Sequence, residues 1–118
     1  MTDTVKQLNW NLREALRYFG INNSRLGYGD TMTAMKFVWE NEDRMRNLEQ
    51  YVYPLVAEAN DRSEAAVKSA IHRAAKAAWK RASSRLKRFD PSLVSAPTNS
   101  ELLEIILQYL DENMEKSR

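Results

Sequence analysis

Hydrophobic residues recur along this chain at the spacing of an α-helix, in stretches separated by short polar segments. In the first stretch they lie three, four and seven positions apart, which predicts a helix from about Asp3 to Phe19. The same pattern predicts further helices over about Asp30–Glu40, Asp43–Val52, Pro54–Ala59, Ser63–Arg81 and Thr98–Met114. We therefore expect an all-α fold of about six helices, and a length of 118 residues suits a single domain spanning residues 1–118.

Residues with strong positional preferences mark the expected helix ends. Gly20 is suited to close the first helix, because glycine readily adopts a positive φ. Pro54 fits the first turn of a short helix, where its missing N–H costs nothing. Ser63 is a favourable N-cap, and Thr98 followed by Glu101 has the spacing of a capping box.

Two parts of the chain are expected to lie outside regular helices. Residues 21–29 contain Asn, Ser and Gly at several positions and are predicted to form a connector. A second irregular region is expected around Ser83–Ser84 and again at Asp90–Pro91, with a short helical turn near Arg85 to Phe89.

Charge is strongly segregated in the longest predicted helix and its continuation. No acidic residue occurs between Glu64 and Asp90, although eight of the 18 Lys and Arg residues lie there. The rest of the chain holds ten cations against 16 carboxylates, so the formal net charge of +2 conceals a basic segment in an acidic domain. A helix with one apolar and one cationic face can pack on a domain and still bind a polyanion such as DNA.

The short helix before this basic segment gives it the form of a helix-turn-helix. A tight turn at residues 60–62 separates the two helices, and the second helix would lie in the major groove of DNA. The side chains expected to contact DNA are Ser63, Lys68, Ser69, His72, Arg73, Lys76, Lys80 and Arg81. Arg73 is the best candidate to read a guanine edge, and a solvated lysine-rich helix without a ligand is the competing interpretation.

Other chemistry is disfavoured by composition. The chain has no cysteine and a single histidine, so we expect no disulfide, no metal site and no nucleophile–base pair. It also lacks a phosphate-binding glycine loop, and we expect neither an enzyme nor a bound cofactor. Without an apolar run of about 20 residues or a signal peptide, the chain is expected to be cytoplasmic and to have no membrane partner.

Several short motifs make the sequence more specific than a generic helical domain. They are Gly20-Ile21, Gly27-Tyr28, Tyr53-Pro54, the helix from Ala70-Ile71 to Trp79, and Pro97-Thr98-Asn99-Ser100-Glu101. Over most of the chain, from about Leu12 to the last helix, the sequence resembles the C-terminal DNA-binding domain of the stage-zero sporulation protein A response regulator family. This resemblance implies a six-helix, winged-helix-like effector domain whose helix-turn-helix binds promoter DNA to regulate transcription during sporulation.

The resemblance also implies partners. It implies a homodimer on double-stranded DNA formed through the last helix, and we expect the contact at Leu103, Ile106, Leu107 and Leu110. RNA polymerase or a related regulator is a further expected partner. The pattern of the last helix agrees with a partner subunit, because Ile105 and Tyr109 give it a second apolar face.

The sequence departs from the family in the residues that would read DNA. Where the family has Glu-Arg and Arg-His, this chain has Lys68-Ser69 and His72-Arg73, so the DNA site of the family is not assumed for this chain. The segment between Trp79 and Pro97 is also shorter than in the family, and the phosphorylated receiver domain is absent, so the effector domain is expected to stand alone. The alternative function is a protein-interaction module that pairs with a related regulator without reading DNA.

Overall fold

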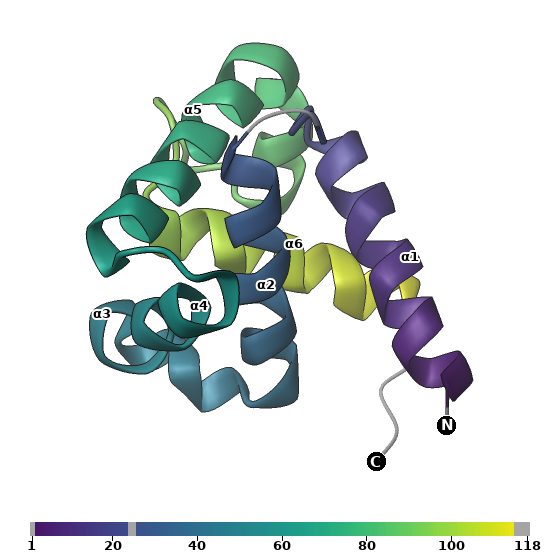
Figure 1. Cartoon of the computed structure of the whole chain (residues 1–118). Coiled ribbons are helices and arrows are strands. Elements are labelled where there is room, and N and C mark those ends of the chain that lie inside the picture. The colour runs from purple at the N-terminus through teal and green to yellow at the C-terminus, as the bar shows by residue number, and fades with distance from the viewer. Residues whose placement is uncertain (1, 24–25, 115–118) are drawn as a thin grey trace.

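The computed structural model describes residues 2–23 and 26–114, and in this part of the chain all regular structure is helical (Figure 1). The elements are α1 (Thr2–Tyr18), α2 (Leu26–Glu40), the 3₁₀ helix η1 (Glu42–Arg46), α3 (Leu48–Tyr51), α4 (Tyr53–Asn60), α5 (Glu64–Phe89) and α6 (Asn99–Asn113). The all-α prediction is confirmed, and the described residues contain no strand that could form a wing beside the helix-turn-helix. None of the described helices is both long and apolar enough to cross a membrane.

The helix ends follow the signals in the sequence. The Ser63 hydroxyl accepts a hydrogen bond from the Ala66 N–H at 3.0 Å and caps α5. Thr98 and Glu101 form a complete capping box at the start of α6. Gly20 has a φ of 75° just beyond α1, and the two hydrogen bonds around it form a Schellman motif.

Helix α2 begins at Leu26, well before the predicted start at Asp30. The prediction assigned Gly27 and Gly29 to a connector, but both residues are helical. The reason is tertiary, because the first turn of α2 is pressed against α5. A Cβ atom at position 27 would lie only 2.5 Å from the Ala70 carbonyl oxygen, so only glycine allows this approach.

The third predicted helix is divided into η1 and α3. Asn41 accepts a hydrogen bond from the Asp43 N–H and starts η1, and Asn47 accepts one from the Gln50 N–H and starts α3. Asn47 is extended, with a φ of −158°, so it interrupts the helix between Arg46 and Leu48. Two asparagine caps therefore replace one longer helix by two short ones.

Helix α5 does not end near Arg81, because it continues with a kink to Phe89. The kink is at Ala82, whose φ of −144° and ψ of 38° are not helical. Beyond it, Leu86 is fully buried and Phe89 packs edge-on against Phe19, with ring centroids 5.7 Å apart. This packing explains why the expected irregular region at residues 83–84 is helical.

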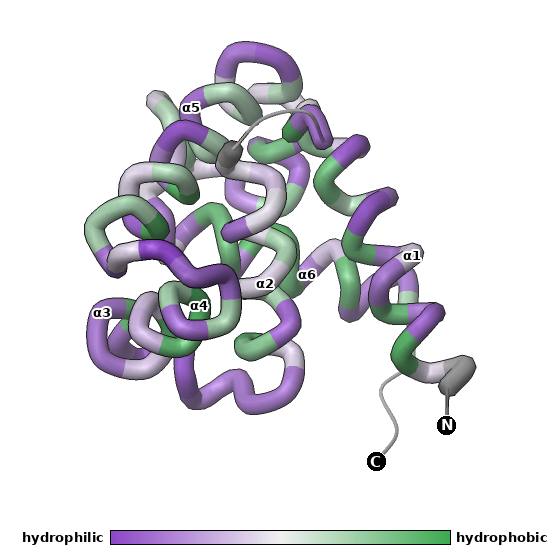
Figure 2. Tube along the Cα trace, in the orientation of Figure 1, coloured by the Kyte–Doolittle hydropathy of each residue, from purple (hydrophilic) through white to green (hydrophobic). Residues whose placement is uncertain are grey.

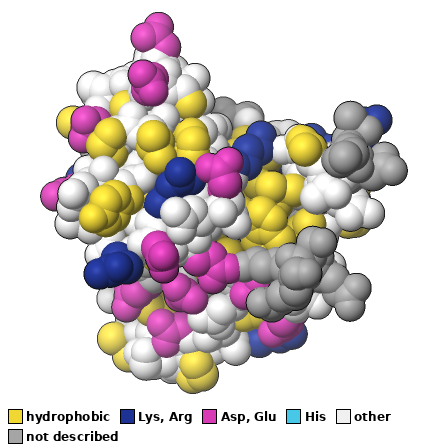
Figure 3. Space-filling view, turned by 90° about the horizontal axis from the view of Figure 1, so that it is seen from below, with side chains coloured by type: hydrophobic (Ala, Val, Ile, Leu, Met, Phe, Trp, Pro, Cys, Tyr) yellow, Lys and Arg dark blue, Asp and Glu magenta, His cyan; other side chains and the backbone are white. Residues whose placement is uncertain are grey.

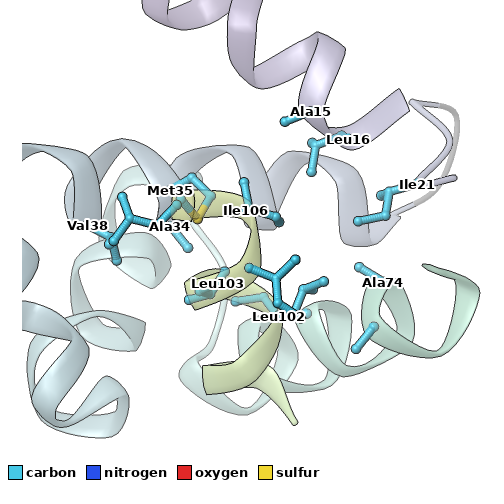
Figure 4. Close-up of a cluster of buried hydrophobic side chains, with 14 of the residues drawn as sticks. Ala15, Leu16, Ile21, Ala34, Met35, Val38, Ala74, Leu102, Leu103 and Ile106 are labelled. Atoms are coloured by element: carbon cyan, nitrogen blue, oxygen red, sulfur yellow. The ribbon is translucent and has the colours of Figure 1, made fainter. Parts of the chain in front are cut away.

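Helix α6 runs through the middle of the molecule and contacts α1, α2 and α5. Side chains of α6, among them Leu102, Leu103 and Ile106, lie within the buried cluster with Met35 of α2 (Figure 4). Hydrophobic parts of the trace gather toward this centre and hydrophilic parts lie at the periphery (Figure 2).

The central position of α6 does not support the expected dimer contact at its apolar side chains. Within one chain the side chains of Leu103, Ile106, Leu107 and Leu110 are buried. The second apolar face is covered as well, because Ile105 is buried and Tyr109 packs against the ring of Tyr18. A second copy would reach these side chains only if α6 left its place.

Candidate nucleic-acid interface

Helices α4 and α5 form the predicted helix-turn-helix, and a buried aspartate of α2 holds the turn between them. Asp61 adopts a left-handed conformation with a φ of 53°, which lets the chain reverse after α4. The Asp30 carboxylate accepts hydrogen bonds from Arg62 Nε at 2.8 Å and from Asn60 Nδ2 at 2.9 Å. Since Asp30 is only 2% exposed, these charge-assisted bonds fix the position at which α5 begins.

The inner face of α5 is made mostly of small side chains. Its buried residues before the kink are Val67, Ala70, Ile71, Ala74, Ala75 and Ala78. The alanines allow the backbones of α2 and α5 to approach closely, as the contact between Gly27 and Ala70 shows. The orientation of α5 is therefore fixed by backbone-to-backbone packing rather than by long interdigitated side chains.

All eight side chains predicted to contact DNA are exposed. Seven of them form the reading face of α5, which consists of Lys68, Ser69, His72, Arg73, Lys76, Lys80 and Arg81. Ser63 is exposed too, but its hydroxyl is engaged in capping the helix. Among residues 2–23 and 26–114, no ion pair is formed by Arg73, Lys76, Lys80 or Arg81. These four cations are therefore free to bind a polyanion.

Lys68 differs from the other cations of the reading face because it forms an ion pair, and its partner was not predicted from the sequence to lie near α5. Its Nζ lies 2.8 Å from Oε2 of Glu49 in α3. The hydrogen bond to Lys68 lowers the pKa of Glu49, and the same bond raises the pKa of Lys68. Both side chains are exposed, so this pair contributes little to stability but places a carboxylate beside the reading face.

Two of the sequence motifs meet α5 at the start of the reading face. The Asn99 amide nitrogen donates to the Tyr53 hydroxyl at 2.9 Å and to the Lys68 carbonyl at 3.0 Å. Asn99 thus joins the Tyr53-Pro54 motif, the Pro97-to-Glu101 motif and α5. A broad hollow of about 910 Å³ opens there, lined by residues of α3, α5 and the segment before α6.

The basic residues beyond the kink serve the fold. Arg85 donates to the Tyr18 carbonyl at 2.9 Å, and Arg88 pairs with Glu112 at 2.9 Å. Lys87 lies 5.4 Å from the ring centre of Trp79. The candidate interface is therefore the part of α5 before Ala82.

Other surfaces carry different chemistry. Acidic side chains gather on the face seen from below, with fewer basic ones between them (Figure 3). In the described part of the chain, no three His, Asp or Glu residues are grouped so that they could hold a metal ion. Among the described residues, the largest group of cations without an ion pair on one helix face is the reading face of α5.

A short helix, a tight turn and a second helix with an exposed cationic face define a helix-turn-helix DNA-binding domain. The chain belongs to the family of the C-terminal domain of the sporulation initiation factor Spo0A, whose sequence model matches residues 12–110. This match confirms the resemblance, and the family consists of DNA-binding regulators rather than enzymes. A comparison with curated proteins finds no match.

Proposed function

We propose that this protein is a sequence-specific transcription regulator that reads promoter DNA with residues 64–81 of α5 and binds as a homodimer. The observation that carries the proposal is the reading face, on which four cations are exposed and unpaired within the described chain. These side chains have no part in the core, so their chemistry is available to a ligand. The dimer contact in this proposal uses exposed residues, since the apolar side chains of α6 are buried.

The position of each side chain suggests its role. Arg73 lines both the hollow beside α3 and a second hollow of about 370 Å³ beside α2, so it lies at the middle of the reading face. From there its guanidinium can donate two hydrogen bonds to a guanine edge. Ser69 and His72, near the start of α5, are suited to neighbouring bases or phosphates. Lys76, Lys80 and Arg81 are suited to phosphates on the flanks.

Selection from random double-stranded DNA at two salt concentrations tests this proposal. Enrichment of a common sequence motif, with retention that weakens as salt rises, is the expected result. Retention without enrichment would indicate nonspecific nucleic-acid binding. A lack of salt-sensitive retention, together with stable complexes with a related regulator, would favour a protein-interaction module instead.

Substitutions of Arg73 and Lys80 are expected to have different effects on DNA binding. Arg73→Ala should cost roughly 1–3 kcal/mol of binding free energy and relax the base preference at one position. Lys80→Ala should weaken binding to all sequences alike and reduce the salt slope by about one. Titrations of both variants against the selected site and a scrambled site provide the measurement. Parent-like binding by both variants would refute this assignment of roles.

Glu49→Gln is expected to strengthen DNA binding. The change removes a carboxylate 2.8 Å from Lys68 and leaves that cation free for a phosphate. Affinity for both specific and scrambled duplexes should rise at low salt, with a salt slope steeper by about one. Glu104→Gln, at an exposed position of α6, is the control for loss of one negative charge. A change in base preference without a change in salt slope would show instead that Glu49 contacts a base.

A further inference from the structure

Helix α1 carries a row of three cations and one tryptophan on the face turned away from the core. The α1 row consists of Lys6, Trp10, Arg13 and Arg17, which are four, three and four positions apart and all exposed. This spacing places them on one side of the helix. The buried residues of α1, such as Leu12 and Leu16, lie on the opposite side.

Trp10 is the unusual member of this row. Its side chain is 56% exposed, although tryptophan has a large apolar surface that proteins generally cover. It shares a shallow hollow of about 510 Å³ with Lys6 and Arg13. An indole flanked by cations offers a flat face for a sugar ring and an N–H donor for a phosphate oxygen.

The α1 row is continuous with the reading face. A hollow of about 330 Å³ is lined by Arg13 and Arg17 of α1, by residues 20–23 and by Arg81 of α5. Arg81 also lines the hollow that contains Arg73 and Lys80, and Arg13 also lines the hollow around Trp10. Shared residues therefore connect three hollows into one cationic path from α5 to α1.

The cations of the α1 row are weakly engaged by the protein. Nη1 of Arg17 lies 3.8 Å from Oε2 of Glu14, and the Arg17 side chain is 81% exposed. Lys6 and Arg13 form no ion pair with another described residue. Exposed pairs of this kind are easily exchanged for phosphate.

We propose that the α1 row binds the sugar–phosphate backbone of DNA next to the segment read by α5. This inference rests on the proposed function of α5. At a rise of about 1.5 Å per residue, the row from Lys6 to Arg17 spans about 16 Å. With about 3.4 Å per base pair, it lengthens the contact with DNA by about five base pairs. Because phosphates are the same in every sequence, α1 adds affinity without adding base preference.

Two duplexes separate this contact from binding by α5. The short duplex contains only the selected site, and the long duplex extends it by about ten base pairs, one helical turn, on each side. The double variant Arg13→Gln/Arg17→Gln is expected to weaken binding to the long duplex roughly three- to tenfold and to reduce the salt slope of that binding by about two. Its affinity for the short duplex should equal that of the parent protein. Trp10→Ala should weaken binding to the long duplex without changing the salt slope. Lys36→Gln, an exposed cation of α2 that lines none of these hollows, should leave both duplexes unaffected.

The outcomes also distinguish failure of this inference from failure of the proposed function. If Arg13→Gln/Arg17→Gln binds both duplexes like the parent while Lys80→Ala weakens both, the α1 contact is refuted and the role of α5 stands. If this double variant self-associates less than the parent but binds DNA with the same affinity, the α1 contact with DNA is also refuted, because the α1 row would then bind a second copy of the chain. A parent protein that binds neither duplex overturns both proposals. Thermal unfolding of each variant, expected to match the parent, verifies that exposed substitutions leave the fold intact.

Discussion

Asp30→Ala is expected to lower the free energy of unfolding by about 3 kcal/mol, in the range measured when one partner of a buried ion pair is removed. Asp30 is 2% exposed and accepts hydrogen bonds from Arg62 at 2.8 Å and Asn60 at 2.9 Å. Its loss leaves a half-buried guanidinium and an amide without their acceptors. Because Asn60 ends α4 and Arg62 lies in the turn before α5, DNA affinity should fall together with stability. Chemical denaturation followed by circular dichroism measures the first effect.

Two further variants test whether this aspartate acts through the turn. Asp43→Ala removes an exposed carboxylate and should change the free energy of unfolding by less than about 0.5 kcal/mol. Arg62→Ala combined with Asp30→Ala should cost clearly less than the sum of the two single changes, since both remove one interaction. Additive costs would mean that Asp30 stabilises the domain by some route other than Arg62.

Gly27→Val is expected to destabilise the domain by about 3 kcal/mol, the upper range for a side chain added to a well-packed site. A Cβ at this position would lie 2.5 Å from the Ala70 carbonyl oxygen and 3.2 Å from the Ala74 Cβ. The obstacle at 2.5 Å is backbone, so α2 and α5 must move apart. Thermal unfolding measures the loss, and Gly27→Ala provides a milder variant should the valine protein not fold.

Gly29 provides the matched control for this experiment. It lies in the same helix, and a Cβ built there meets no atom within 4 Å. Gly29→Val should therefore be close to neutral, and Gly29→Ala should be stabilising by roughly 0.5–1 kcal/mol through helix propensity. Equal destabilisation at both positions would mean that backbone freedom, rather than the contact with α5, requires the glycines.

The sequence predicted those features that depend on local chemistry. The caps at Ser63 and Thr98, the reversal at Gly20 and the start of α4 around Pro54 are confirmed. Each depends on hydrogen bonds or dihedral angles within a few residues, so the chain reveals them directly. The exposure of the reading face was predictable for the same reason, because it follows from helical spacing in one segment.

The sequence could not predict features that depend on contacts between distant residues. Gly27 looks like a turn former until the backbone of Ala70 is placed beside it. Glu49 is an ordinary surface residue until α3 brings it to Lys68, 19 positions along the chain. The apolar surplus of α6 suggested a partner subunit, but α1, α2 and α5 of the same chain cover the helix on several sides. In each case tertiary packing decided the role of the residue.

The small residues on the inner face of α5 also determine whether the protein or the DNA changes conformation when the two bind. With Ala70, Ala74 and Ala78 buried against its neighbours, α5 has little freedom to tilt or shift. A rigid protein leaves the adjustment to the double helix, whose bending costs depend on its sequence. Selected sites should accordingly favour flexible pyrimidine–purine steps at positions that no side chain touches. Part of the sequence specificity of this domain would then come from the deformability of the DNA rather than from contacts with base edges.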